Sequence, residues 1–352
     1  MADELLELLK RLSQAHGPPG QEDEVADIVI SELKGHVDEV FRDSFGNVIA
    51  RKGSGEKSLM IAAHMDEIAL IVKSIDGKGF IRFAKLGGIW DQLLVGQHVV
   101  IHGSKGRVRG VIGSKAVHVM KEDERRQLLT YDKMFIDVGA KSASEVKEMG
   151  VEIGDFITID KPFIQLANSL VAGKAFDDRA GCAALIQAVK QAEPNCKVYA
   201  VFTVQEEVGL RGATVSGYAV KPTVGIAVDV TIAGDHPGME AHEAPVKVGG
   251  GPVILAADGR RDSLGGGLIP NPKVKRWIMS VAEKLKIPFQ LEVLEGGTTD
   301  ATAIHLSREG VPSGVISIPT RYIHTFQEIL SMEDLERLTS LLKGLMESGV
   351  PV

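Results

Sequence analysis

Three short apolar runs in this chain each end in side chains that can bind metals or move protons. The runs and their polar followers are Leu59 to Ala63 with His64 and Asp66, Val198 to Val204 with Glu206 and Glu207, and Val224 to Val228 with Asp229. Continuous β-branched and apolar runs of this length predict buried parallel strands. Because open α/β sheets bind ligands at the carboxyl ends of their strands, these side chains are expected to meet in one crevice.

Helical periodicity fills the intervals between the strands. The predicted helices cover about 3–12, 22–33, 180–189, 272–286 and 331–346, and a hairpin is predicted around Asn47. Two more strands are predicted at 289–294 and 311–318. Residues 245–271 are rich in glycine and are predicted to be irregular, flexible surface. The alternation of strands and helices indicates an α/β domain.

The pattern of apolar and polar residues changes from Ile68 to about Phe163. Here short segments of alternating apolar and polar residues are separated by turns that contain Gly and Lys. Many short strands without long helices predict a small β-domain. We interpret it as an insertion at 68–163 into a catalytic domain formed by 1–67 and 164–352. The polar residues on either side of the insertion must then come together in space.

Composition narrows the function classes. The chain has 352 residues with 40 basic and 47 acidic side chains, a net charge of −7, and no Lys/Arg-rich block, so no nucleic-acid partner is expected. An acidic, amphipathic amino terminus and the lack of an apolar run of about eighteen residues predict a cytoplasmic protein without membrane contact. Cys182 and Cys196 have no C-x-x-C spacing, which favours buried thiols over a disulfide or a thiolate zinc site.

The candidate ligands are imidazoles and carboxylates without cysteine. To the strand-end residues the chain adds Asp177 and Asp178, which precede a helix, and His324, which follows the last strand. Such ligands suit Zn²⁺, Co²⁺ or Mn²⁺, and an excess of acids suits two cations. Two metals sharing a water activate it for hydrolysis of an acyl bond. The two aspartates could instead cap the helix, and His236 and His242 compete with His324, whereas His305 is expected to pack inside a helix.

Five ordered motifs resemble those of the M42 family of dinuclear metallo-aminopeptidases, which includes the tetrahedral aminopeptidases. They are His64-Met65-Asp66, Phe176 to Gly181, Gln205 to Gly209, Val228-Asp229-Val230 and Arg321-Tyr322-Ile323-His324. The resemblance covers nearly the whole chain. It implies a zinc-peptidase-like mixed sheet sandwiched by helices, with an inserted small β-barrel or PDZ-like domain that pairs subunits. It also implies two divalent ions per subunit, Zn or Co, and a dodecamer of dimers that admits peptides with a free amino terminus.

The resemblance also implies a role for each motif residue. His64 and Asp229 would bind one metal and Glu207 and His324 the other, with Asp177, or alternatively Asp178, bridging the two ions. The peptide bond between Asp177 and Asp178 would be a candidate for the cis form. Glu206 would be the general base and Asp66 would orient His64.

Departures from the family pattern at Ala69, Gly249 to Pro252, 258–270 and Gly296 to Asp300 fall where substrate would lie, so the preferred amino-terminal residue stays open. Two rival functions also stay open. Paired carboxylates can cleave glycosides, although histidines among the acids and an aromatic content of 5% speak against it. A non-catalytic peptide-binding scaffold is the other rival, although every expected ligand is present.

Overall fold

The computed structural model describes residues 2–351, so Met1 and Val352, at the outer ends of the predicted catalytic domain, lie outside the described residues. The chain divides into two compact units. The larger comprises Met1–Asp66, Phe163–Ile323 and Gln327–Val352, and the smaller comprises Glu67–Pro162 and His324–Phe326. The smaller unit thus takes a short segment from near the carboxyl end of the chain, which the sequence pattern did not predict.

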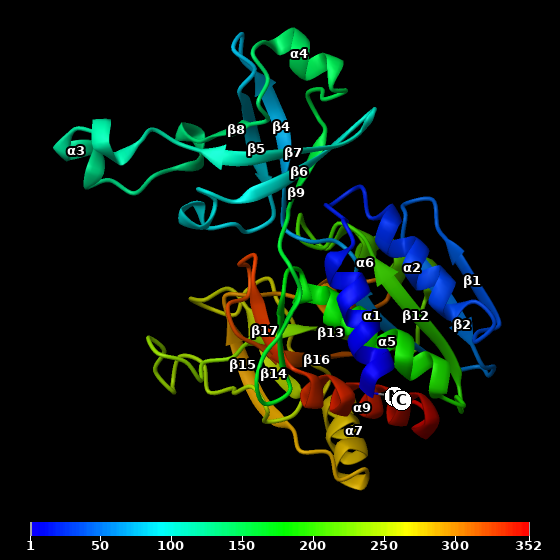
Figure 1. The fold of residues 1–352 in the computed structure, drawn as a ribbon. Coiled ribbons are helices and arrows are strands. Elements are labelled where there is room, and N and C mark those ends of the chain that lie inside the picture. The colour runs from blue at the N-terminus through cyan, green and yellow to red at the C-terminus, as the bar shows by residue number, and fades with distance from the viewer. Residues whose placement is uncertain (1, 352) are drawn as a thin grey trace. The chain divides into compact units, whose positions relative to one another are not determined.

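An eight-stranded mixed sheet forms the centre of the larger unit (Figure 1). In spatial order its strands are β1 (Glu39–Arg42), β2 (Val48–Lys52), β12 (Lys197–Thr203), β3 (Ser58–His64), β13 (Val224–Ile232), β16 (Ser313–Thr320), β14 (Val253–Gly259) and β15 (Gln290–Glu295). The four central strands β12, β3, β13 and β16 are parallel, which explains their unbroken apolar sequences. β2 pairs antiparallel with both β1 and β12, and β14 pairs antiparallel with β16, so the predicted mixed sheet is confirmed.

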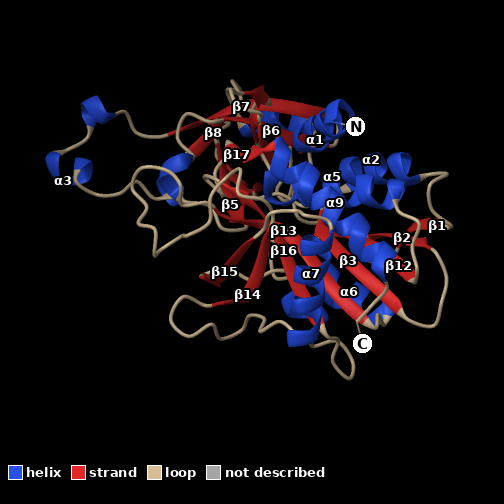
Figure 2. Cartoon of the chain, turned by 90° about the horizontal axis from the view of Figure 1, so that it is seen from below, coloured by secondary structure: helices blue, strands red, loops and turns tan. Residues whose placement is uncertain are grey.

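Helices cover both faces of this sheet, as Figure 2 shows. One face packs against α2 (Asp23–Leu33), α5 (Phe176–Gln191), α7 (Pro272–Lys284) and α9 (Met332–Ser348), with α1 (Ala2–Gln14) packed on α5 and α9, and the other face packs against α6 (Arg211–Val220) and α8 (Asp300–Ile304). The apolar residues of the central strands alternate between these two interiors, so the sheet is buried on both sides.

The prediction of flexible surface at 245–271 is wrong for its middle part. Residues 253–259 form β14, which lies between β16 and β15 in the sheet. Nearly all of its side chains are buried. The strand is short and glycines flank it on both sides, so its sequence carries a turn signal although the tertiary structure pairs it on both edges. A separate three-stranded sheet of β10 (Ile164–Gln165), β11 (Leu170–Gly173) and β17 (Glu328–Ser331) was also not predicted.

The smaller unit is a closed barrel of six strands in the order β4-β5-β8-β7-β6-β9. The strands are β4 (Ala69–Ile75), β5 (Ile81–Leu86), β6 (His98–Gly103), β7 (Gly106–Gly113), β8 (Phe135–Asp137) and β9 (Phe156–Ile159), with short helices α3 (Glu122–Arg125) and α4 (Ala143–Glu148) and three 3-10 turns, η1 (Asp91–Leu93), η2 (Val117–Val119) and η3 (Tyr131–Lys133). Closure removes exposed strand edges. Phe326 packs into its core, so the 324–326 segment is part of it.

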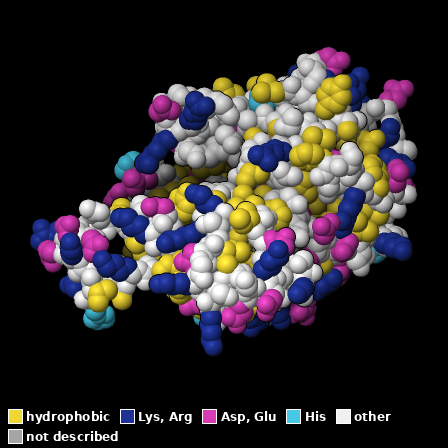
Figure 3. Space-filling view, turned by 90° about the horizontal axis from the view of Figure 1, so that it is seen from above, with side chains coloured by type: hydrophobic (Ala, Val, Ile, Leu, Met, Phe, Trp, Pro, Cys, Tyr) yellow, Lys and Arg dark blue, Asp and Glu magenta, His cyan; other side chains and the backbone are white. Residues whose placement is uncertain are grey.

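Among residues 2–351, no helix combines the length and the apolar character needed to cross a bilayer. On the face that Figure 3 shows, acidic and basic side chains are intermixed.

Candidate metal centre

The parallel register brings the predicted strand-end residues to one edge of the sheet. His64, the last residue of β3, lies opposite Thr203, the last residue of β12. Asp229 lies two residues beyond Ala227, which pairs with Ala62 of β3. Asp229 is therefore at the level of His64 on the neighbouring strand. β13 continues three residues past Asp229, so the prediction that the strand ends there is wrong.

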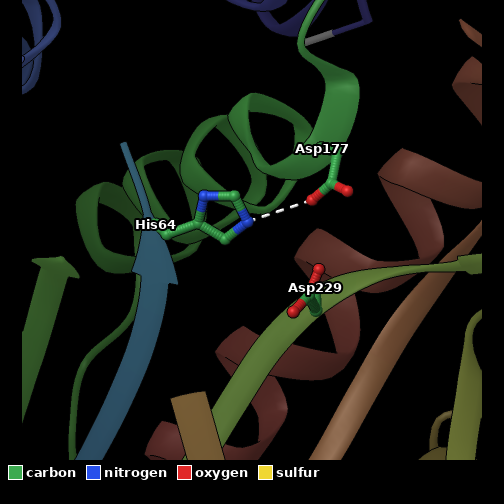
Figure 4. Close-up of side chains that lie close together, drawn as sticks. All are labelled: His64, Asp177 and Asp229. Atoms are coloured by element: carbon green, nitrogen blue, oxygen red, sulfur yellow. Dashed lines mark hydrogen bonds and ion pairs between the residues drawn. The ribbon is translucent and has the colours of Figure 1, made fainter. Parts of the chain in front are cut away.

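His64, Asp177 and Asp229 form a buried ligand group (Figure 4). One ligand atom from each lies within 4.8 Å of the others, and His64 Nε2 is 3.0 Å from Asp177 Oδ1. The other ring nitrogen of His64, Nδ1, is 3.2 Å from the backbone carbonyl of Asp66. A proton on Nδ1 leaves the lone pair on Nε2, the arrangement typical of a metal-binding histidine.

The two aspartates at the start of α5 have different surroundings. Both have non-helical backbone angles, and the peptide bond between them is cis. The backbone N–H of Asp177 donates to Glu328, and its side chain joins the ligand group. The carboxylate of Asp178 instead accepts hydrogen bonds from the backbone N–H groups of His64 and Gly181. Asp178 therefore supports the backbone of the site.

Asp66 supports the loop that carries the two glutamates. Its two carboxylate oxygens accept hydrogen bonds from the backbone N–H groups of Glu206, at 2.9 Å, and Glu207, at 3.0 Å. Its Oδ1 lies 3.6 Å from His64 Nδ1, which is beyond good hydrogen-bond geometry. Asp66 thus contacts the histidine mainly through its own carbonyl. An oxygen of Glu207 lies within 4.8 Å of one of Asp177, so Asp177 has a second acidic neighbour outside the group it forms with His64 and Asp229.

Arg179 also supports the backbone that follows β3. It is fully buried, and its guanidinium donates to the carbonyl oxygens of Met65 and Leu12, both at 2.6 Å, and of Ala15, at 3.2 Å. These bonds connect the end of α1 to the backbone beside His64.

Electrostatics at this edge favour cation binding. Burial alone lowers the pKa of His64, but the hydrogen bond to Asp177, the nearby carboxylate of Asp66 and the charge of Glu206 together raise this pKa well above its usual value. Burial, followed by the charge of Asp177, raises the pKa of Asp229. Burial also raises the pKa of Glu206, with the charges of neighbouring acids adding to it. Carboxylates crowded in this way are stabilised as anions by divalent cations.

Asp300 is an acid of this edge that the sequence reasoning did not assign. It begins α8, its Oδ2 accepts a 2.5 Å hydrogen bond from the hydroxyl of Thr203, and its buried Oδ1 has no protein partner among the described residues. Its charge contributes to the raised pKa values of Glu206 and Asp229. The only sequence signal was its position directly after a glycine-threonine turn and before a short helix.

The histidine candidates fall into distinct places. His324 belongs to the smaller unit, where its Nδ1 is 2.8 Å from the carbonyl oxygen of Gly88. His236 is 5.2 Å from the ring of Tyr322, and His305 bonds its own helix through Ala301. Neither His236, His242 nor His305 belongs to a group of possible metal ligands within the described part of the chain.

A mixed sheet between helices, with a buried imidazole–carboxylate group at the carboxyl edge of its strands, defines a metal-dependent hydrolase of the α/β peptidase type. The model of the M42 glutamyl aminopeptidase family matches residues 46–341, and the chain belongs to this family. The predicted resemblance is thereby confirmed, and the protein is a peptidase that depends on divalent metal.

Individual relatives agree over almost the full length. A putative aminopeptidase of Acetivibrio thermocellus is 42% identical over 342 residues, 97% of this chain and 98% of the relative. The crystal structure of a TET aminopeptidase from Thaumarchaeota archaeon SCGC AB-539-E09 is 42% identical with a TM-score of 0.93, covering 98% of this chain and 96% of the other. The TET1 peptidase of Pyrococcus horikoshii, which can assemble into a tetrahedron or a large octahedral shell, is 34% identical with a TM-score of 0.88, covering 98% of this chain and all of the other.

Proposed function

We propose that this protein is an aminopeptidase that uses two divalent metal ions, zinc or cobalt, to remove the amino-terminal residue of peptides. The observation that carries the proposal is the buried group of His64, Asp177 and Asp229 beside the Glu206–Glu207 loop. Its donor set of one imidazole and several carboxylates fits Zn²⁺ or Co²⁺.

The ligands divide into two sets. His64 and Asp229 would hold one ion, Glu207 and His324 would hold the other, and Asp177 would be shared by both. Asp177 is preferred to Asp178 as the bridge because the carboxylate of Asp178 is occupied by backbone N–H groups. The hydrogen bond of His324 Nδ1 to Gly88 favours Nε2 as its metal-binding nitrogen.

Glu206 is the proposed general base. When bound, the metal ions supply a water that ionises near neutral pH and polarise the scissile carbonyl. Glu206 would take a proton from the attacking water and later give it to the leaving amine. Burial and the neighbouring acids raise the pKa of Glu206, which suits a group that must both accept and return a proton. Asp66 holds the Glu206 backbone through this cycle, and the surplus of acids attracts the substrate ammonium group.

The decisive experiment compares wild-type protein with Glu206→Gln on aminoacyl-p-nitroanilides. Gln keeps the backbone bond to Asp66 but cannot take a proton, so kcat is expected to fall by about 10²- to 10⁴-fold with metal content unchanged. A peptide with an acetylated amino terminus is the substrate control and should not be cleaved. Equal turnover by both proteins would refute the role of Glu206.

The same assay separates the rivals. Aminopeptidase activity that a chelator removes and Co²⁺ or Zn²⁺ restores excludes a glycoside hydrolase mechanism and a non-catalytic scaffold. Hydrolysis of β-glucan with no release of amino acids would support the glycosidase instead. The family match and the relatives that are named aminopeptidases favour the peptidase.

We also propose a cytoplasmic homo-oligomer, a dodecamer of dimers paired through the β-domain of residues 68–163. The TET1 peptidase that resembles this chain forms large shells, which supports the assembly. Native mass spectrometry of the purified protein tests it, with a stable monomer as the contrary result. Cell fractionation tests the location.

A further inference from the structure

Four successive backbone amides in the loop of the two glutamates are each held by a side chain. Val204 N–H donates to Asn47 at 3.1 Å and Gln205 N–H to Glu22 at 3.1 Å. The next two amides, of Glu206 and Glu207, donate to the two oxygens of Asp66. The three acceptors come from the turn before α2, the turn before β2 and the segment after β3.

The loop needs these acceptors because it leaves the sheet here. Gln205 has a φ of +57°, in the left-handed region that non-glycine residues rarely adopt, and β12 ends two residues earlier. Amides that turn away from the strand ladder must find other partners when they are buried. The side chains of Asn47, Glu22 and Asp66 therefore replace the ladder for four residues.

Glu22 accepts from the amide of Gln205, the one loop amide that neither Asn47 nor Asp66 binds. Its Oε1 accepts from Gln205 N–H and also from Gly20 N–H, at 2.7 Å, so a single atom connects the amino-terminal turn to the loop. Glu22 is 6% exposed, and among the described residues no ion pair joins it to a cation. Burying a carboxylate without a cation partner is unfavourable, so stabilisation of the fold alone does not account for a glutamate at this position.

We propose that Glu22 is a positioning residue for Glu206 and Glu207, acting through its hydrogen bond to the backbone N–H of Gln205. This inference rests on the proposed function of the two glutamates. The proposed role depends on the length of the side chain, which brings an acceptor oxygen within hydrogen-bond distance of the Gln205 amide. The negative charge at position 22 is not required. Loss of that oxygen frees the amide next to Glu206 and lets the loop move, and displacements of about 1 Å can lower a rate by about 10²-fold.

Three substitutions at position 22 separate the effect of side-chain length from the effect of charge. Glu22→Gln keeps an acceptor oxygen at the same distance without the charge, Glu22→Asp keeps the charge but is one methylene shorter, and Glu22→Ala removes both. We expect kcat within about 3-fold of wild type for Glu22→Gln and a fall of about 10- to 100-fold for Glu22→Ala, with little change in KM and with Glu22→Asp in between. Glu22→Asp is the milder test if Glu22→Ala does not fold.

Two readouts do not depend on turnover. Hydrogen exchange at the amides of 204–207 should be faster in Glu22→Ala and Glu22→Asp than in wild type and unchanged in Glu22→Gln. The affinity for the ion that Glu207 and His324 are proposed to hold, measured by competition with a chelating dye, should fall by about 10-fold or more in Glu22→Ala because the displaced loop carries Glu207.

Asn271→Ala is the matched control. Asn271 caps α7 by accepting from Lys273 N–H and Val274 N–H, and it lies at the opposite edge of the sheet, where its own N–H bonds Ser313 at the start of β16. Its replacement also removes the acceptor of two amides, so it should lower Tm without changing kcat or exchange at 204–207.

The inference is overturned if Glu22→Ala matches Asn271→Ala in kcat and loop exchange. It is also overturned if Glu22→Asp retains activity while Glu22→Gln loses it, because activity would then depend on the charge at position 22 and not on the length of the side chain. A wild-type protein that cleaves no peptide would refute the proposed function alone, since the exchange and metal measurements would still test the link between Glu22 and the loop.

Discussion

The cost of keeping a carboxylate at position 22 can be measured as a pH-dependent difference in stability. Burial, followed by the charge of Asp66, raises the pKa of Glu22 from 4.5 to about 7. Between these values the folded chain binds more protons at this site than the unfolded chain. Its contribution to the free energy of unfolding therefore falls as pH rises from about 4.5 to 7, and the full penalty remains above pH 7.

Glu22→Gln removes that penalty and keeps an acceptor for the amides of Gly20 and Gln205. The folded and unfolded pKa values differ by about 2.5, which at about 1.4 kcal/mol per pKa unit gives about 3.5 kcal/mol. We expect the variant to be more stable than wild type by up to about 3.5 kcal/mol at pH 8 and equally stable near pH 4. Taking the difference between the two proteins at each pH cancels the titration of all the other groups.

Urea unfolding of chelator-treated protein at four or five pH values between 4 and 8 provides the assay, because bound metal would alter the charge near Asp66. Glu22→Ala is the control: it also lacks the charge but leaves two amides without an acceptor, so it should be less stable than Glu22→Gln at every pH. A difference between Glu22→Gln and wild type that does not vary with pH would refute the reasoning.

Three further predictions follow from the site. Asp177→Asn should reduce bound metal, measured by elemental analysis, in both positions, whereas Asp178→Asn should keep two ions per chain; the reverse pattern would identify Asp178 as the bridge. Gly88→Ala places a Cβ 2.9 Å from His324 Nδ1 and should weaken the second ion about 10-fold or more in chelator titrations, and unchanged affinity would contradict the role of His324. Arg179→Met leaves three buried carbonyl oxygens without their donor and should lower the free energy of unfolding by about 3–5 kcal/mol in urea, while a loss under about 1 kcal/mol would show that the network is dispensable.

The sequence alone determined the class of fold and most of the candidate ligands. Apolar runs long enough to be buried on both faces identified the strands that end near His64, Glu206 and Asp229, because a parallel strand needs apolar side chains in both directions. The change to short alternating segments after residue 67 identified the barrel, because its antiparallel strands turn only every second side chain toward the interior. Ordered motifs then indicated the family, which the comparisons show.

Tertiary structure decided which partners each polar group has. Asp66, Asp177 and Asp178 look alike in sequence, yet one carboxylate holds the glutamate loop, one joins the ligand group and one holds the backbone of His64. β14 was hidden because seven residues between glycine-rich segments resemble a loop until neighbouring strands pair with both edges. Glu22 gave no signal because its partner is 183 positions away, and a hydrogen bond between a side chain and a distant backbone amide leaves no periodic trace in sequence.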